Sequence, residues 1–139
     1  MHMEETASLR EIGAEGLTVT DPAEDVRGRK VLDTAGEHIG DVDDLLVEHG
    51  QHIVRFLRVA AGGFLGLGET KFLIPVDAIT SIDDQAVHVN RTREHVTSGP
   101  RYDPDLINKP HHLTTVYEHY GSVPFWAEGY TYPTFPYYR

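Results

Sequence analysis

The chain contains no cysteine, and this absence excludes disulfide bonds, thiolate metal sites and cysteine nucleophiles. With 139 residues, the chain is long enough to bury a core without such cross-links. The missing disulfides favour a reducing compartment, so we expect a cytoplasmic protein. Long apolar runs are missing as well. None approaches the roughly 20 residues that cross a bilayer, and we expect no membrane span.

Cations are scarce in this sequence. Lys and Arg number 12 against 22 Asp and Glu, which gives a formal net charge of −10 at pH 7. Such an acidic surface repels phosphate backbones and anionic lipid at long range. We therefore expect no direct contact with nucleic acid, whereas a protein partner remains open.

Signatures of catalysis are also missing. The four serines, at positions 8, 81, 98 and 122, all lie outside the G-x-S-x-G pattern that presents a serine nucleophile. The sequence marks no Asp or Glu pair that would share a pocket. We therefore expect a protein that is not an enzyme, with no catalytic residue and no cofactor.

One loop is rich in glycine. Four glycines fall within the seven residues 62–68, and Lys71 follows. A dinucleotide-binding loop needs a G-x-G-x-x-G spacing, and a P-loop needs four residues between its glycines followed by Lys and Ser or Thr. Both need a helix directly behind the loop. Here the spacing differs, and the following residues, FLIPV, have the pattern of a strand. The pattern predicts a hairpin loop whose apolar residues either fold back onto the core or meet a partner. These residues are Phe64, Leu65 and Leu67.

The middle of the chain carries strand patterns. Short runs rich in β-branched and aromatic residues alternate with turn residues. These runs cover 39–47, 53–59, 72–76, 79–82 and 87–89. Such spacing indicates a mainly β fold, a small antiparallel β-barrel or sandwich, rather than alternating βαβ units. Gly36 in a turn is expected to need a positive φ, and Gly40 inside a strand to mark a bulge or tight bend.

The composition changes after Pro100. All seven tyrosines, the only tryptophan and six of the eight prolines lie at or beyond this position. Apolar residues spaced i, i+3, i+4 and i+7 predict a short amphipathic helix at about 110–120. These residues are Leu113, Val116, Tyr117 and Tyr120. The residues beyond the helix are too rich in proline for another helix, and they predict an extended aromatic tail.

These patterns divide the chain into three parts. Residues 1–20 are polar and predict a flexible arm whose end can pair with the domain. Residues 21–98 form the barrel domain, which opens with one helical turn after Asp21. Residues 99–139 form a C-terminal extension that contains the helix and the tail.

Four segments of the barrel region occur in a characteristic order: VRGRKV at 26–31, DTAGEHIGDVDDLLV at 33–47, RFL at 55–57 and FLIPVDAI at 72–79. Together they resemble the PRC-barrel domain, over roughly residues 21–98. That family includes the cytoplasmic domain of the photosynthetic reaction-centre H subunit. It also includes the second half of a ribosome maturation factor, which binds a small-subunit ribosomal protein. The resemblance implies a small β-barrel that works as an interaction module and not as an enzyme.

Neither specific role in that family is expected to transfer. The H subunit has a transmembrane helix before its barrel, and the maturation factor has another domain there. This sequence shows no such helix, and residues 1–20 are too few for a domain.

Two groups of polar residues raise the question of metal binding. The acids at 41, 43, 44 and 48 do not follow the calcium-loop pattern, because Leu46 takes the place of its glycine. We interpret them as a solvated strand face. On the expected helix, His112 and His119 stand about 10 Å apart along the axis and cannot share one ion. A metal would need further ligands, such as His88, His95 or a second subunit. We assign no metal site, and a histidine-based regulator that binds metal or protons is an alternative.

We expect a non-catalytic module for protein–protein interaction or assembly that works as a homo-oligomer, for example a homodimer. The tail aromatics either pack on their own barrel or along a symmetry mate, or they are displayed to another protein. Packing on self is favoured, because a free tail with this many aromatics would aggregate. An accessory factor in ribosome maturation or RNA processing is the alternative function. The partner-binding candidates are Phe64, Leu65, Leu67, Tyr117, Tyr120, Phe125 and Trp126.

Overall fold

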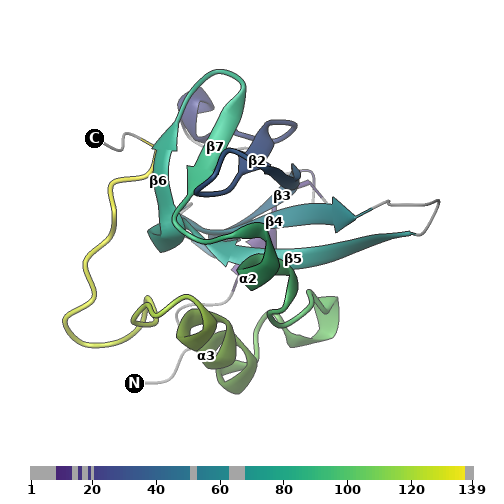
Figure 1. Cartoon of the computed structure of the whole chain (residues 1–139). Helices are drawn as coiled ribbons and strands as arrows, with labels where there is room; N and C mark the ends of the chain where they lie inside the picture. Colours follow the sequence, from purple (N-terminus) through teal and green to yellow (C-terminus); the bar gives the residue numbers. More distant parts are fainter. Residues whose placement is uncertain are drawn as a thin grey trace.

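The computed structural model describes residues 9–13, 16, 19, 21–50, 53–62 and 68–136. Within them the chain is mainly β, as predicted, with two short α-helices beside one sheet (Figure 1). The strands are β1 Leu9–Glu11, β2 Lys30–Leu32, β3 His38–Glu48, β4 Ile53–Gly62, β5 Glu69–Pro75, β6 Ile79–Ile82 and β7 Ala86–Val89. The α-helices are α2 Arg93–Thr97 and α3 Pro110–His119, and the 3-10 turns are η1 Pro22–Glu24, η3 Val76–Ala78 and η4 Pro104–Leu106.

The strands form a seven-stranded sheet in the order β5-β4-β3-β2-β7-β6. Neighbours on this path are antiparallel, except for β2 and β7, which run parallel. Strand β1 pairs with the end of β3, whereas β2 pairs with its beginning. Among the described residues no ladder joins β5 to β6, so hydrogen bonds do not close the sheet. The sheet wraps into a barrel-like fold, and the η3 turn carries the chain from β5 to β6 (Figure 1).

Two glycines shape the barrel. Gly36 has a φ of 81°, the positive value that its turn predicts. At Gly40 in β3, an added Cβ would lie 2.2 Å from the carbonyl oxygen of Ala60. The sequence predicts a bulge or a tight bend at Gly40. The structure agrees, because the register of β3 against β2 shifts between Gly40, which pairs with Val31, and His38, which pairs with Leu32.

Helix α3 completes the core of the barrel. It begins at Pro110, as its sequence predicts, and it buries Leu113, Val116 and Tyr117. The ring of Tyr117 packs against Phe56 of β4, with the ring centroids 5.1 Å apart. The short C-terminal helix is therefore confirmed, and its apolar face belongs to the same core as the sheet.

The tail beyond α3 packs on the barrel of its own chain (yellow in Figure 1). Phe135, near the end of the described residues, is buried in the core. The hydroxyl of Tyr132 donates a hydrogen bond of 3.0 Å to the backbone oxygen of Val54 in β4. Of the arrangements left open by the sequence, packing in cis is the one that this single chain adopts.

The interpretation of the β3 acids as a solvated face is wrong for two of the four. The exposed fraction is 1% for Asp44 and 5% for Glu48. A register shift between Val42 and Asp44 breaks the simple alternation of the strand and turns Asp44 inward. There its Oδ1 accepts hydrogen bonds of 2.8 Å from the backbone N–H groups of Gly13 and Leu45. Asp41 is exposed, as predicted.

The N-terminal arm was expected to be flexible up to residue 20, but Leu9–Glu11 forms strand β1. Leu9 and Ile12 are buried in the core. The side chain of Asn108 also binds the backbone of β1. Its Oδ1 accepts from the N–H of Leu9 at 2.6 Å, and its Nδ2 donates to the oxygen of Leu9 at 3.3 Å.

Candidate functional site

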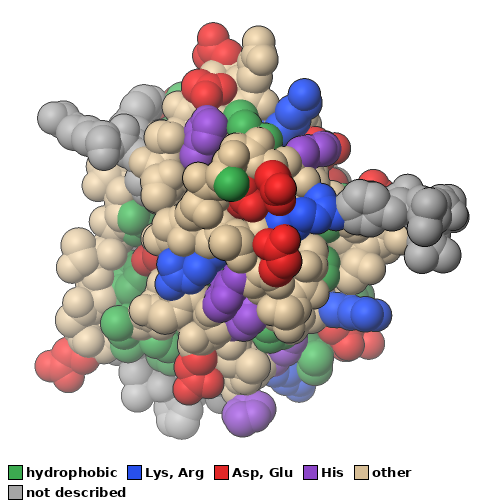
Figure 2. All heavy atoms as spheres, in the orientation of Figure 1, with side chains coloured by type: hydrophobic (Ala, Val, Ile, Leu, Met, Phe, Trp, Pro, Cys, Tyr) green, Lys and Arg blue, Asp and Glu red, His purple; other side chains and the backbone are tan. Residues whose placement is uncertain are grey.

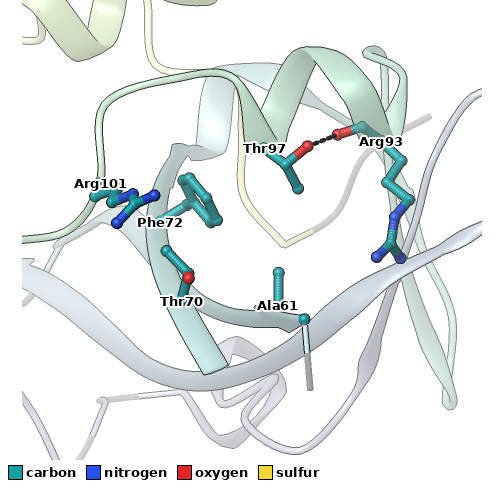
Figure 3. A pocket seen from close by; sticks show the side chains of 7 residues that line it. Ala61, Thr70, Phe72, Arg93, Thr97 and Arg101 are labelled. Carbon is teal, nitrogen blue, oxygen red and sulfur yellow. Dashed lines mark hydrogen bonds between the residues drawn. The ribbon is translucent and has the colours of Figure 1, made fainter. Parts of the chain in front are cut away.

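A small cleft opens where the barrel meets the C-terminal extension. Its volume is about 230 Å³, and we call it the arginine cleft. It is lined by Ala61, Gly62, Thr70, Phe72, Arg93, Thr97 and Arg101. Figure 3 shows Arg93 and Arg101 on opposite sides, with Thr97 between them at one rim and Thr70 and Ala61 across from it. The lining residues come from the hairpin of β4 and β5, from α2 and from the segment behind α2.

Helix α2 is fixed in place by a turn of the barrel. Thr92 caps the helix by accepting a hydrogen bond from the N–H of His95 at 3.1 Å. The N–H of Arg93 donates to Oδ2 of Asp33 at 3.0 Å. Burial works to raise the pKa of Asp33, but N–H donors from Glu37, Arg93 and Ala35 outweigh it, and the pKa lies below its usual range. This carboxylate therefore stays ionised and anchors the start of α2.

The two arginines are held by different contacts. Nη1 of Arg93 donates to the backbone oxygen of His38 at 2.5 Å, which ties its guanidinium to the start of β3. Thr97 Oγ1 donates to the oxygen of Arg93 at 3.0 Å, one turn earlier in α2. Arg101 is placed by its backbone, which forms an isolated antiparallel bridge with Phe72 of β5. Its side chain is exposed.

The lining of the arginine cleft offers donors and positive charge. No Asp or Glu is among the described residues that line it. Thr70 and Phe72 line it from β5, whereas Lys71 between them pairs with Asp43 at 2.6 Å. Two guanidinium groups around one hollow can hold an oxyanion through charge-assisted hydrogen bonds, and the Thr70 hydroxyl can add a donor. The Thr97 hydroxyl does not add one, because its proton is donated to the backbone oxygen of Arg93.

A second cluster joins the tail to the barrel around Arg55 of β4. The Arg55 side chain is buried, and it pairs with Oε1 of Glu48 through Nε at 2.9 Å and Nη2 at 2.6 Å. Three tail rings surround its guanidinium, with centroids 4.6 Å away for Phe125, 5.7 Å for Tyr130 and 5.3 Å for Tyr132. We call these five residues the Arg55 cluster. Cation–π contacts and an ion pair together hold the tail on β4.

The tyrosines of this region are neutral at physiological pH. Burial raises the pKa of Tyr117, Tyr130 and Tyr132 above the ordinary value of tyrosine, and nearby carboxylates add to the shift. Burial also raises the pKa of Asp77, which lies beside Tyr130. The positive charge of Arg55 acts against burial and lowers the pKa of each of these four groups.

The partner-binding candidates from the sequence occupy different places. Phe64, Leu65 and Leu67 lie outside the described residues. Tyr117, Tyr120 and Phe125 are buried, and Trp126 is half-buried against the core. Trp126 brings three of the four together, since its ring meets those of Tyr117 and Phe125 edge-on at 6.0 and 5.1 Å. Tyr120 lies apart from them, beside His95 and His119.

His95 and His119 link α2 to α3. Their rings stack with centroids 4.1 Å apart, and Nε2 of each lies 2.6 Å from the backbone oxygen of the other. The contact is tight, because an added Cβ on Gly99 would lie 2.6 Å from the ring of His119. In the part of the chain that the structure describes, no three His, Asp or Glu side chains gather to hold a metal ion.

Sequence reasoning missed the three arginines that organise these two regions. Arg55 gave a signal, because a charge inside the apolar run IVRFLRV needs a partner if the strand is buried. Arg93 and Arg101 gave none. The bridge between Phe72 and Arg101 brings Arg101 to the cleft that Arg93 also lines. This bridge is a long-range contact that no local sequence pattern predicts.

Comparison with protein families shows to which family the chain belongs. Residues 19–96 match the model of the PRC-barrel domain. The chain belongs to the PRC-barrel family. The matched region contains Arg93 but stops short of Arg101, so the arginine cleft lies between the PRC-barrel domain and the extension of this chain. The Arg55 cluster joins the same two parts, since Arg55 and Glu48 lie in the domain and its three rings in the tail. A search of curated proteins finds no match to this chain.

The charged surface of this PRC-barrel protein is mixed. On the face shown in Figure 2, acidic, basic and histidine side chains are interspersed and do not separate by sign. Among the helices formed by the described residues, none is long and apolar enough to cross a bilayer.

Proposed function

We propose that this PRC-barrel protein is a non-catalytic module for protein–protein interaction or assembly, and that it acts in the cytoplasm as a homo-oligomer. Membership of the PRC-barrel family over residues 19–96 is the observation that carries this proposal. The absence of cysteine from the chain supports a reducing compartment. The net charge of −10 favours a protein partner over a nucleic acid.

Part of the proposed contact set is buried in the single chain. Tyr117, Tyr120 and Phe125 are buried in cis, so their side chains reach a partner only if the extension leaves its barrel. Phe64, Leu65 and Leu67 are the candidates that the sequence places in a hairpin loop, where apolar residues can meet a partner. We therefore propose the loop as the primary contact. We also propose that the chain is organised as an arm at 1–20, a barrel domain at 21–98 and a C-terminal extension at 99–139.

The test is the oligomeric state of the full chain, measured by light scattering after size exclusion. The wild type is expected to elute as a dimer or larger assembly. A variant with Phe64, Leu65 and Leu67 changed to Ser is expected to elute as a monomer. The matched control is Val123→Ser, because Val123 is a described apolar residue with 53% of its surface exposed. If the wild type is a monomer, the proposal of a homo-oligomer is wrong. If the triple variant assembles like the wild type, the loop is not the contact.

A further inference from the structure

We propose that the arginine cleft is a binding site for a small oxyanion, the phosphate or carboxylate group of a small molecule. The bound group would bridge Arg93 and Arg101. This inference goes beyond the proposed assembly function, since it concerns a ligand that is not a protein.

The geometry of the cleft provides for such a ligand. Arg93 and Arg101 lie on opposite sides of the hollow, with Phe72 beside Arg101 and with Thr97 and Thr70 at the rims between them (Figure 3). Guanidinium groups carry N–H donors in a fixed fork that matches the oxygens of carboxylate and phosphate. Phe72 and Ala61 give the cleft an apolar part that excludes water on one side, which strengthens these charge-assisted bonds.

One of the two donors is held in place before any ligand arrives. His38 O fixes the guanidinium of Arg93 at 2.5 Å, and Asp33 accepts from the Arg93 N–H. On the other side, the bridge to Phe72 and the hydrogen bond of 2.7 Å from Tyr102 N–H to Lys71 O fix the backbone around Arg101, whose exposed side chain becomes ordered on binding. The conformational entropy lost on binding is therefore mainly that of the Arg101 side chain.

Arg101 has no acidic partner among the described residues. Arg27 pairs with Asp25 at 2.7 Å, whereas Arg29 and Arg91 donate to backbone and amide oxygens. No described carboxylate lies within ion-pair distance of Arg101. A bound oxyanion would supply the missing negative charge.

Size and long-range charge restrict the ligand class. The cleft holds about 230 Å³, less than the ~300–1,000 Å³ typical of sites for drug-sized molecules. One phosphate group or a short dicarboxylate fits that space. The net charge of −10 disfavours polyanions such as nucleic acid or an anionic membrane, whose many charges are repelled together. A small anion with one or two charges meets far less repulsion.

The test is a titration of the full ¹⁵N-labelled chain followed by NMR, with chloride keeping the ionic strength constant. Sodium phosphate and sodium succinate are the two probes. We expect saturable shifts in the amides of Ala61, Thr70 and Thr97 with at least one probe. Arg101→Ala is expected to weaken that binding by about ten-fold or more, because it removes a charge-assisted donor. Saturation with phosphate alone would identify a phosphoryl ligand, and saturation with succinate alone a carboxylate ligand.

The matched control is Arg29→Ala. It removes the same charge from an arginine that donates to the backbone oxygen of Asp83 and does not line the cleft. We expect its titration to equal that of the wild type. The proposal is overturned if neither probe saturates, if sodium chloride alone gives the same shifts, or if the Arg101 and Arg29 variants lose affinity equally. None of these results depends on the oligomeric state, so the two proposals fail separately.

Discussion

At the scale of single residues, Arg55 shows how one buried charge organises a surface. Its positive charge needs Glu48 and the faces of aromatic rings, because desolvation of an unpaired charge is costly. The tail supplies those rings. The position of the C-terminal residues thus depends on a polar residue in the middle of a strand.

Arg55→Ala is expected to destabilise the fold by about 3–5 kcal/mol, because it leaves the Glu48 carboxylate buried without its partner. The measurement is the free energy of unfolding from urea denaturation. Arg27→Ala, which breaks the more exposed pair with Asp25, is the control and is expected to cost less than about 1 kcal/mol. Equal costs for the two variants would mean that the Arg55 cluster does not hold the tail.

Asp77 gives a prediction about pH. Burial raises its pKa in the folded state, so the folded chain keeps this proton to higher pH than the unfolded chain does. Stability is therefore lost as pH rises from about 4, the ordinary range of aspartate, through the raised pKa. Asp77→Asn removes this loss.

The Asp77→Asn variant is expected to be more stable than the wild type at pH 7, and the gain should vanish below about pH 4. The gain should stay below about 1 kcal/mol, since Asp77 is only partly buried and solvent screens its charge. Thermal unfolding from pH 3 to pH 8 measures it. Asp84→Asn in the exposed turn is the control, and a gain of the same size there would refute the burial argument.

At the scale of elements, local patterns predicted much of the fold. The hairpin of β6 and β7 and helix α3 follow directly from alternation, turn residues and helical spacing. Long-range pairings did not follow from the sequence. The parallel pairing of β2 with β7 and the pairing of β1 with β3 join segments far apart along the chain. The register shift at Asp44 also has no local signal, and it reversed the expected exposure of that residue.

The same limit applies to the arginine cleft. The sequence showed the glycine-rich hairpin on one side of it, but helix α2 on the other side was not predicted. The cleft forms because the backbone at Arg101 pairs with Phe72 of β5. Residue chemistry was visible in the sequence, but the distance between the two arginines was not.

Helix α3 is the element whose packing is easiest to test. Leu113→Ala is expected to cost about 2–5 kcal/mol, because the side chain is fully buried between α3 and the sheet. His111→Ala on the exposed face of the same helix should change stability by about 0.5 kcal/mol or less. Urea denaturation of both variants makes the comparison. A small loss at Leu113 would show that the helix is not part of the cooperative core.

At the scale of the whole molecule, the family domain and the extension share one hydrophobic core. The family match ends at residue 96, yet the core continues through α3 and the tail. The described part of the extension adds six buried hydrophobic side chains, namely Leu113, Val116, Tyr117, Tyr120, Phe125 and Phe135. Burying one large apolar side chain contributes about 1.5–3 kcal/mol, whereas a whole domain is stable by only about 5–15 kcal/mol.

A chain that ends at Gly99 is therefore expected to lose cooperative folding, even though it keeps the whole family match. Without the extension, the apolar face of β4 around Phe56 would be exposed to water, and Arg55 would lose its three ring contacts. Circular dichroism during thermal unfolding and the dispersion of amide NMR signals measure the loss. A chain that ends at Pro136 keeps all six side chains and should unfold like the full chain. If the chain ending at Gly99 folds as well as these two, the barrel is stable by itself, and the extension is free to leave it and bind a partner.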